Sequence, residues 1–293
     1  MEKLMIAGYD DAYNNFEDYL DGKKKGTILL AAPVVNINEW CTSGPSPYLT
    51  LLGLTREEME KILYYAVIVV KEKDGTFSLV SEAEYQERKQ EEEIEAYTGA
   101  EALGKMLESL THDKLSSILS SARTTEQECM AALEKLDEEG AGEEETEEDE
   151  AFSDEEPAPT ERDKIREKLD HARETLDAVW YFEKFGTSRL ILDKIDVLPL
   201  QVRAILEKHR NTIPYSVLND VSVLYARVAE RNERVRKLTN LGAPAIIMRN
   251  EKRMLQEGVD NLINNGRRGR PATTPGGHVL TSLSDVILKS YNF

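Results

Sequence analysis

Two stretches of helical hydrophobic periodicity, separated by a Gly-Ala-Pro break, constrain the fold of this sequence most strongly. Gly242 suits the end of the first helix, and Pro244 suits the first turn of the next. The pattern therefore predicts an antiparallel helical hairpin over 217–264, with arms about 30–36 Å long and outer faces open to a partner. The apolar positions are Val221, Leu224, Val228, Val235 and Leu238 on the first arm, where Arg231 takes the remaining d position, and Ile246, Ile247, Met254, Leu255, Val259, Leu262 and Ile263 on the second.

Charge is distributed very unevenly along the chain. The formal net charge is −18, and such an acidic average argues against a nucleic-acid-binding protein. However, Asp137–Glu156 holds 13 acidic residues and no basic one, whereas residues 201–293 hold 15 Lys and Arg against 8 Asp and Glu. We interpret 137–160 as a disordered acidic linker that acts as a solvated spacer. A nucleic-acid mimic is the alternative for this segment.

Several classes of protein are excluded by what the sequence lacks. Cys41 and Cys129 are far apart, so this chain alone forms neither a zinc ribbon nor a disulfide scaffold. The four histidines share no ligand spacing, which argues against a metal site. No apolar run reaches the roughly 18 residues that cross a bilayer, and the N-terminus has no signal-peptide pattern. We expect a soluble, cytoplasmic protein with no membrane partner.

The remaining patterns predict a mixed fold of the α+β class that is mainly α-helical. Thr55 followed by Glu58 is a capping-box pattern for a short helix over Thr55–Leu63. Asp74-Gly75 predicts a hairpin turn, and Trp40 and Trp180 are expected to pack in a core or an interface. The further expected elements are strands at Gly26–Val35, Tyr65–Lys71, Phe77–Val80 and Ser188–Val197, and helices at Ser81–Leu110 and Asp163–Phe185.

One long stretch resembles a known family. Residues 249–271 (RNEKRMLQEGVDNLINNGRRGRP), with 224–241 before them and Leu283-Ser284-Asp285 after them, resemble the clamp region of the β′ subunit of bacterial multisubunit RNA polymerase. Residues 26–36 (GTILLAAPVVN) and 44–70 resemble the segment that follows the zinc ribbon of that subunit. Arg189–Arg203 is similar to the strand that leads to its lid. The resemblance covers about 200 residues of the chain and is strongest over 221–271.

The resemblance implies an order of parts along the chain. The hairpin would be the clamp helices, and the loop 265–277 would be the rudder beside the RNA–DNA hybrid. At the expected lid position, 205–216, the sequence departs from the Gly-Gly-Arg-Phe pattern of the family. The predicted domains are 1–26 (unassigned), 27–136 (clamp base of strands and helices), 137–160 (acidic linker), 161–216 (helix, strand and lid-like loop), 217–264 (clamp-helix hairpin) and 265–293 (rudder-like basic loop and C-terminus).

The resemblance also implies a surface that docks the sigma factor. Three of its positions, Arg231, Arg234 and Lys237, form a basic ridge at i, i+3 and i+6, which independently suits an acidic partner. A solvated helix face is the structural alternative. Gly258 departs from the usual alanine of the family, at a cost of about 1 kcal/mol in helix propensity. The full predicted set is Arg231, Arg234, Lys237, Asn250, Glu251, Gln256 and Gly258.

Three arginines of the basic loop, Arg267, Arg268 and Arg270, suit contacts with phosphate groups of DNA or of an RNA–DNA hybrid. The Asp-rich magnesium loop and the zinc-ribbon cysteines of the family are absent from this sequence. We therefore expect no catalytic residue, cofactor or metal in this chain, with Mg²⁺ and Zn²⁺ held elsewhere in the assembly.

The implied function is that of a β′-like clamp fragment in transcription, within a nucleotidyltransferase whose catalysis resides in another chain. Its expected partners are the β subunit, the rest of β′, sigma, DNA and the hybrid. We expect a piece of a split subunit or a truncated product. Two alternatives remain: a stand-alone DNA-binding protein that uses the AT-hook-like core 268–271 (RGRP), and a regulator that binds free sigma.

Overall fold

The computed structural model describes residues 26–91, 93–140, 160–197 and 215–286. It divides into two compact units: unit 1 (Met1–Gly44, Leu54–Ser109 and Thr187–Phe293) and unit 2 (Pro45–Gly53 and Leu110–Gly186). The predicted class, a mainly helical α+β fold with small antiparallel sheets, is confirmed. In chain order the elements are β1 (Thr27–Val35), α3 (Ile37–Trp40), α4 (Pro47–Leu52), α5 (Arg56–Leu63), β2 (Ile68–Lys71), β3 (Phe77–Val80), α6 (Glu82–Glu91), β4 (Glu95–Tyr97), α7 (Gly99–Glu108), α8 (His112–Gly140), α9 (Glu161–Phe185), β5 (Ile191–Asp196), α11 (Tyr215–Asn240) and α12 (Ala245–Asn264).

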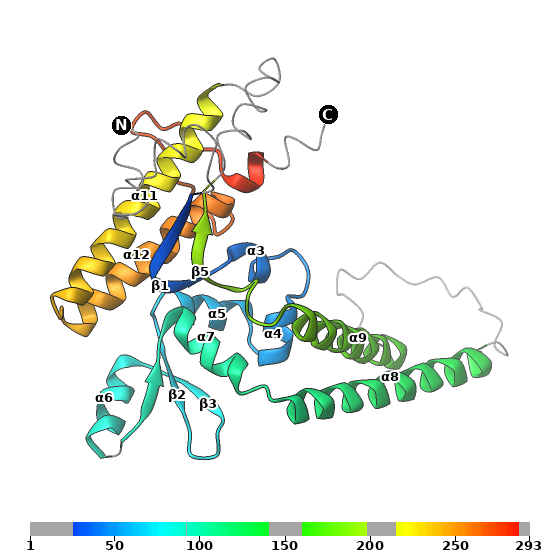
Figure 1. Cartoon of the computed structure of the whole chain (residues 1–293). Coiled ribbons are helices and arrows are strands. Elements are labelled where there is room, and N and C mark those ends of the chain that lie inside the picture. Colours follow the sequence, from blue (N-terminus) through cyan, green and yellow to red (C-terminus); the bar gives the residue numbers. More distant parts are fainter. Residues whose placement is uncertain (1–25, 92, 141–159, 198–214, 287–293) are drawn as a thin grey trace, which may run out of the picture. The chain divides into compact units, whose positions relative to one another are not determined.

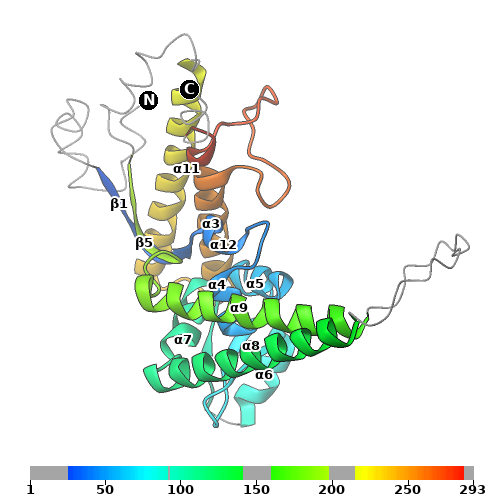
Figure 2. The ribbon, with the colours of Figure 1, turned by 90° about the vertical axis from the view of Figure 1, so that its right-hand side faces the viewer.

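The helical hairpin predicted from periodicity is present in unit 1, where α11 and α12 lie side by side in both views (Figure 1, Figure 2). Val228, Val235, Leu255 and Val259 are fully buried between the arms and the neighbouring strands. Gly242 adopts a positive φ of 65° at the turn, which a residue without Cβ tolerates at little cost. The spacing of apolar residues thus specifies both arms and their connection.

Two apolar residues of the return arm do not lie in the core as expected. Ile246 is 69% exposed and Ile247 is 44% exposed, and Leu241 beside them is 79% exposed. They lie at the connection, where α11 has already ended at Asn240 and the facing arm provides no further turn to cover them. The tip of the hairpin is therefore an exposed apolar patch.

The hairpin packs against a two-stranded antiparallel sheet of β1 and β5, which correspond to the strands expected at Gly26–Val35 and Ser188–Val197. The pairing register shifts between Leu29 and Val34, so β1 has backbone groups that β5 does not bind. Two buried amides bind some of them. Asn232 of α11 accepts from Ala31 N (2.6 Å) and donates to Leu29 O (2.9 Å), and Gln256 of α12 binds both backbone groups of Val35. Polar side chains inside the hairpin therefore fasten it to β1.

The second sheet of unit 1 has the order β3-β2-β4. Its β2–β3 hairpin turns at Asp74-Gly75 as predicted, with Gly75 at a φ of 82°. The capping box at the start of α5 is also confirmed, because Thr55 Oγ1 accepts from Glu58 N and the Glu58 carboxylate accepts from Thr55 N. The strand predicted from Tyr65 begins only at Ile68, since Tyr65 has a positive φ of 62° in the turn after α5.

A single polar helix over Ser81–Leu110 was predicted, and this prediction is wrong. The segment holds two helices, α6 and α7, and between them the short strand β4, which pairs with β2. The helix α7 starts at Gly99, whose positive φ of 61° breaks the helical path. A strand of three residues is too short to show an alternating pattern in the sequence. The pairing of β4 with β2 determines the structure here, and the local sequence does not indicate that pairing.

Unit 2 is built on two long helices, α8 and α9, which run alongside one another (Figure 2). Tyr48 packs edge-on against Tyr181, with ring centroids 5.8 Å apart, and its hydroxyl donates to Gly186 O. Trp180, which was expected to pack in a core or an interface, is 58% exposed, with Lys184 Nζ 4.7 Å from its ring centroid. It does not lie in the core, because Ala178 and Val179 turn toward the core and the next residue on the helix points away. Packing of Trp180 in an interface stays a prediction.

The acidic linker predicted at 137–160 lies mostly outside the described residues. Asp137–Gly140 form the last turn of α8, and Thr160 caps α9 through Asp163. No helix among the residues that the structure describes is long and apolar enough to cross a membrane.

Candidate partner and nucleic-acid interface

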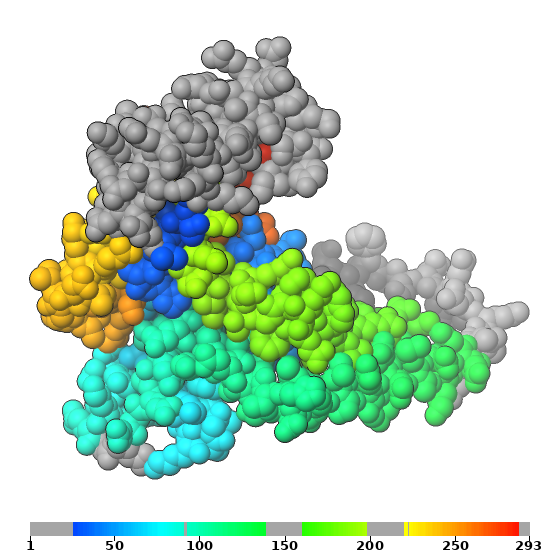
Figure 3. All heavy atoms as spheres, in the orientation of Figure 1, coloured from blue at the N-terminus to red at the C-terminus, as the bar shows by residue number. Residues whose placement is uncertain are grey.

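The predicted basic ridge lies along α11. The side chains of Arg234 and Lys237 are 60% and 70% exposed. Arg231 is half-buried and its Nη1 lies 3.4 Å from Met254 Sδ across the hairpin. The space-filling view shows gold atoms of the hairpin at the surface (Figure 3), and the two arms share one buried core. The ridge is thus part of a packed two-helix surface.

Arg234 is tied to the opposite arm by an ion pair. Its Nε lies 2.9 Å from Oε1 of Glu251, a side chain of which only 4% is exposed. The second carboxylate oxygen of Glu251 has no hydrogen-bond partner among the described residues. An ion pair with one desolvated partner is stronger than a fully exposed pair. Glu251 therefore holds Arg234 across the hairpin, while the guanidinium remains accessible.

The predicted residues of the return arm do not share one surface. Asn250 is exposed and accepts a hydrogen bond of 2.9 Å from Arg253. Gln256 is only 3% exposed and binds Val35, and a Cβ added to Gly258 would lie 3.8 Å from Val228 Cγ2 of the facing arm. In this structure Gln256 and Gly258 therefore face inward, and the accessible members are Arg231, Arg234, Lys237 and Asn250.

The three predicted arginines, Arg267, Arg268 and Arg270, line one hollow of about 410 Å³ in unit 1. Arg267 Nε donates to Cys41 O at 2.6 Å. The Arg268 guanidinium carbon lies 3.2 Å from the ring centroid of Tyr64, a cation–π contact. The other lining residues are Ile37, Glu257, Asp260, Asn261, Asn264 and Gly266.

The loop that holds these arginines is closed by a side chain. Asn265 Oδ1 accepts from Ala272 N at 2.8 Å, and Asn265 Nδ2 donates to Ala272 O and Leu280 O. Because Arg267 and Arg268 are bound to the body of unit 1, both would have to leave these contacts in order to enter a minor groove as an AT-hook does.

A buried carboxyl group lies at the base of the hollow. Asp260 is 3% exposed; its Oδ2 accepts from Tyr64 Oη at 2.6 Å and its Oδ1 accepts from Gln256 Nε2 at 2.9 Å. Burial raises the pKa of Asp260 to about 7, although both hydrogen bonds and the nearby Arg268 act in the opposite direction. Burial, followed by the charge of Asp260, raises the pKa of the Tyr64 phenol well above its usual range. Tyr64 therefore remains a neutral donor at all ordinary pH values.

Sequence reasoning missed Tyr64 and Asp260 as members of this site. A signal for Asp260 was present, because Gln256 and Asp260 are polar residues at i and i+4 beside the apolar Leu255 and Val259. Polar residues in such a stripe need buried partners. Tyr64 offered no comparable signal, since it lies about 200 positions away along the chain.

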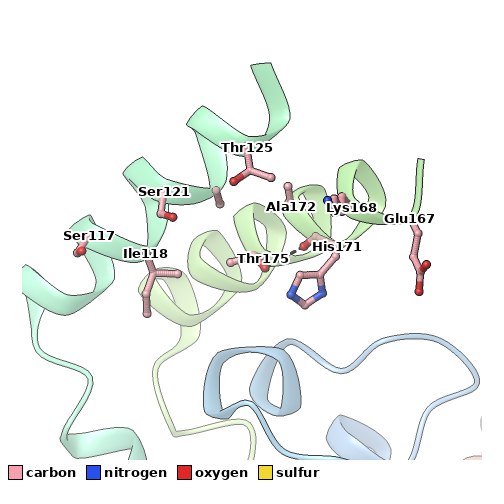
Figure 4. A pocket seen from close by; sticks show the side chains of 10 residues that line it. Ser117, Ile118, Ser121, Thr125, Glu167, Lys168, His171, Ala172 and Thr175 are labelled. Carbon is pink, nitrogen blue, oxygen red and sulfur yellow. Dashed lines mark hydrogen bonds between the residues drawn. The ribbon is translucent and has the colours of Figure 1, made fainter. Parts of the chain in front are cut away.

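A second hollow, of about 650 Å³, lies between α8 and α9 of unit 2 (Figure 4). It owes its volume to short side chains such as Ser121, Ala122 and Ala172, which leave space between the helices. His171 and Thr175 project from α9 there, and the Thr175 hydroxyl donates to the His171 carbonyl. Nothing in this hollow identifies a ligand. Within the described ranges no three His, Cys, Asp or Glu side chains are grouped so as to hold a metal ion. The predicted lid-like loop lies almost entirely outside those ranges.

Comparison with known proteins first defines the class. Residues 17–289 match the family described as RNA polymerase Rpb1, domain 1, and the chain belongs to this family. Bacterial relatives then narrow the class. The chain is 38% identical over 275 residues to the DNA-directed RNA polymerase subunit beta' of Caldicellulosiruptor saccharolyticus and 37% identical over 276 residues to that of Clostridium novyi. Each alignment covers 90% of this chain and 20% of the relative, so the chain spans about a fifth of the length of these subunits. The resemblance inferred from the motifs is therefore confirmed.

Proposed function

We propose that this chain is a clamp segment of a DNA-directed RNA polymerase that docks a sigma factor on the hairpin α11–α12 and contacts nucleic acid through the arginine loop. In this proposal it assembles in the cytoplasm with a β subunit and the remainder of β′. Nucleotidyl transfer is carried out by residues outside this chain. The similarity to β′ subunits over 90% of the chain supports the assignment.

The observation that carries the sigma-docking proposal is the exposed basic ridge on a packed two-helix surface. The side chains of Arg234 and of Lys237, which pairs with Glu233 at 3.5 Å, are exposed. Buried Glu251 offsets part of the charge of Arg234 but restricts its side chain to one position. Because the Arg234 side chain is already restricted in the free chain, it loses less conformational entropy when a partner binds. Fixed positive charges along one ridge suit an acidic helix of a partner, both for rate of association and for register. The exposed apolar side chains of Leu241 and Ile246 lie at the tip beside the ridge, and a bound partner would remove their surface from water.

A charge-reversal experiment tests this docking surface. Sigma factor from the same source is immobilised, and the full chain is titrated at 0.1 M KCl as wild type, as Lys237→Glu and as Arg231→Glu. We expect each variant to bind at least about tenfold more weakly, mainly through a slower association rate. The matched control is Arg123→Glu, which makes the same charge change on an exposed position of α8 in unit 2.

Circular dichroism and thermal unfolding show whether each variant keeps its fold. Folded Lys237→Glu and Arg231→Glu chains that bind sigma within twofold of wild type would refute the docking surface. If binding is lost equally in the Arg123→Glu control, net charge rather than the ridge is responsible, and the proposal also fails. Sigma binding by the full chain does not distinguish a polymerase segment from a free sigma-binding regulator. Co-purification with β and the remainder of β′ supports the former, and its absence supports the latter.

A further inference from the structure

A chain of contacts runs from the backbone of β1 to the arginine loop. Gln256 binds Val35 through both its amide oxygen and its amide nitrogen, each at 2.7 Å. The same nitrogen donates to Asp260, and the other oxygen of Asp260 accepts from Tyr64. Both Gln256 and Asp260 are 3% exposed. The bonds of Gln256 are thus buried and the bond of Tyr64 to Asp260 is part-buried, and such hydrogen bonds are costly to break without a replacement partner.

The last link is the face of the Tyr64 ring. Its hydroxyl is fixed by Asp260, so the ring has one orientation, and the guanidinium of Arg268 lies over its face at 3.2 Å from the centroid. Arg268 is nevertheless exposed at the hollow that Arg267 and Arg270 also line. A guanidinium that stacks on a ring keeps its N–H groups directed outward in the plane of the stack. These donors therefore remain able to bind an anion.

Asp260 itself is a poor counter-ion for Arg268. Burial disfavours its charged form, and its two oxygens are already occupied by Tyr64 and Gln256. The aromatic face thus holds the arginine without neutralising it. An arginine held by a carboxylate would lose part of its attraction for a phosphate, whereas one held by a ring keeps its full charge. This arrangement suits a site for an anionic group better than a structural ion pair would.

We propose that Tyr64, fixed by Asp260, is a positioning residue that holds Arg268 at the hollow so that its guanidinium binds a single phosphate group of a nucleic-acid backbone. This inference rests on the proposed nucleic-acid contact of the arginine loop and names the residues that organise it. The contact is independent of base sequence, because only phosphate oxygens are bound. Tyr64 does not contact the nucleic acid and acts only through Arg268.

The test is a double-mutant cycle on the full chain. A fluorescein-labelled RNA–DNA hybrid is titrated by anisotropy at several KCl concentrations with wild type, Tyr64→Leu, Arg268→Gln and the double variant. Arg268→Gln is expected to weaken binding about fivefold at 0.1 M KCl and to reduce the salt slope by about one. Tyr64→Leu should give the same loss, and the double variant should be no weaker than either single variant. Tyr64→Phe retains the ring but loses its hydrogen bond to Asp260, so its affinity should fall between those of wild type and Tyr64→Leu.

Different failures are distinguishable. If the triple variant Arg267→Gln, Arg268→Gln, Arg270→Gln binds the hybrid like wild type, or if wild type does not bind it, the proposed nucleic-acid contact fails and this inference fails with it. If Arg268→Gln weakens binding but Tyr64→Leu does not, or if the losses of the two single variants multiply in the double variant, the contact stands and the positioning role is refuted.

A measurement on the wild-type chain covers the case in which Tyr64→Leu does not fold. In a chain with labelled arginine, the δ-methylene protons of Arg268 should resonate upfield because of the Tyr64 ring, with the assignment made by Arg268→Lys. The same resonances should move when the hybrid is added. Resonances at ordinary arginine positions in the free chain would overturn the proposal.

Discussion

At the scale of single residues, Asp260 makes the stability of unit 1 depend on pH. Its pKa is about 7 in the folded chain and about 3.8 when unfolded. Between these values the folded chain holds a proton that the unfolded chain has released. Stability from this group is therefore greatest below about pH 4 and decreases as the pH rises to about 7. Above pH 7 the ionisation of buried Asp260 lowers the free energy of unfolding by its full amount. This amount is on the order of 4 kcal/mol at most, since each pKa unit corresponds to about 1.4 kcal/mol.

Replacement of Asp260 by Asn removes this titration. The amide is uncharged and can still bond to Tyr64 and Gln256, so Asp260→Asn should flatten the fall in stability between pH 5 and pH 8. Urea unfolding followed by the fluorescence of buried Trp40, in a Trp180→Phe background, reports on unit 1 alone. The control Glu257→Gln removes a charge from a half-exposed neighbour that pairs with Arg253. An unchanged pH dependence in Asp260→Asn would show that Asp260 is ionised in the folded chain at pH 5. The groups that face Asp260 are Tyr64, Gln256, Glu257 and Arg268.

The sequence predicted the charged members of the candidate site but not the groups that organise them. Arginines on an exposed ridge or loop can be recognised in the sequence, because they either interrupt an apolar pattern or occur close together in a short segment. The roles of Gln256 and Glu251 depend on which way each side chain points, and a rotation of one position around the helix decides between solvent and interior. The partners that decide this, Val35 and Arg234, lie on other elements.

At the scale of elements, two glycines with a positive φ should respond differently to alanine. Gly99 begins α7 at a φ of +61°, and an added Cβ would lie 2.5 Å from the Tyr65 ring, whereas Gly75 turns the β2–β3 hairpin at +82° with nothing within 4 Å. Gly75→Ala should cost about 1 kcal/mol from backbone strain alone. Gly99→Ala should cost about 2 kcal/mol more, since the partly buried ring must also move.

Urea midpoints of the two variants, measured by Trp40 fluorescence in the Trp180→Phe background, give the comparison within one unit of the protein. In a Tyr65→Ala background, which lacks the obstructing ring, Gly99→Ala should cost less than it does in wild type. Equal costs at the two glycines would show that the ring moves freely, and the start of α7 would then not depend on this contact.

Elements with a local signal were predicted well, and elements that depend on distant pairing were not. The two arms of the hairpin, the capping box of α5 and the turn at Gly75 each follow from residues within a few positions of one another. The strand β4 exists because β2 offers a free edge, and nothing in Glu95–Tyr97 alone indicates it. The long helix α8 was not anticipated, because its Ser- and Thr-rich first half has low helix propensity and is stabilised by packing against α9.

At the scale of the whole molecule, the charge of the chain opposes the function proposed for it. The predicted contact residues all lie in unit 1, within the basic third of the sequence, yet the net charge is −18. Ten of the acidic residues fall within 141–156. Such a run repels an approaching polyanion over a distance set by the Debye length, about 30 Å at 0.01 M salt and below about 10 Å at 0.3 M.

Neutralisation of these ten residues, by Glu→Gln and Asp→Asn, should therefore strengthen binding of the labelled RNA–DNA hybrid about tenfold at 0.01 M KCl. At 0.3 M KCl the variant and wild type should bind within twofold of each other, because the long-range repulsion is then screened. A chain in which the order of residues 141–156 is scrambled keeps their charge and should match wild type at both concentrations. The neutralised chain could still bind the hybrid more tightly than wild type at 0.3 M KCl, and the scrambled chain could do the same. That result would mean that the acidic run binds the arginine loop directly as a nucleic-acid mimic. No change at 0.01 M KCl would mean that the field of the run does not reach the loop.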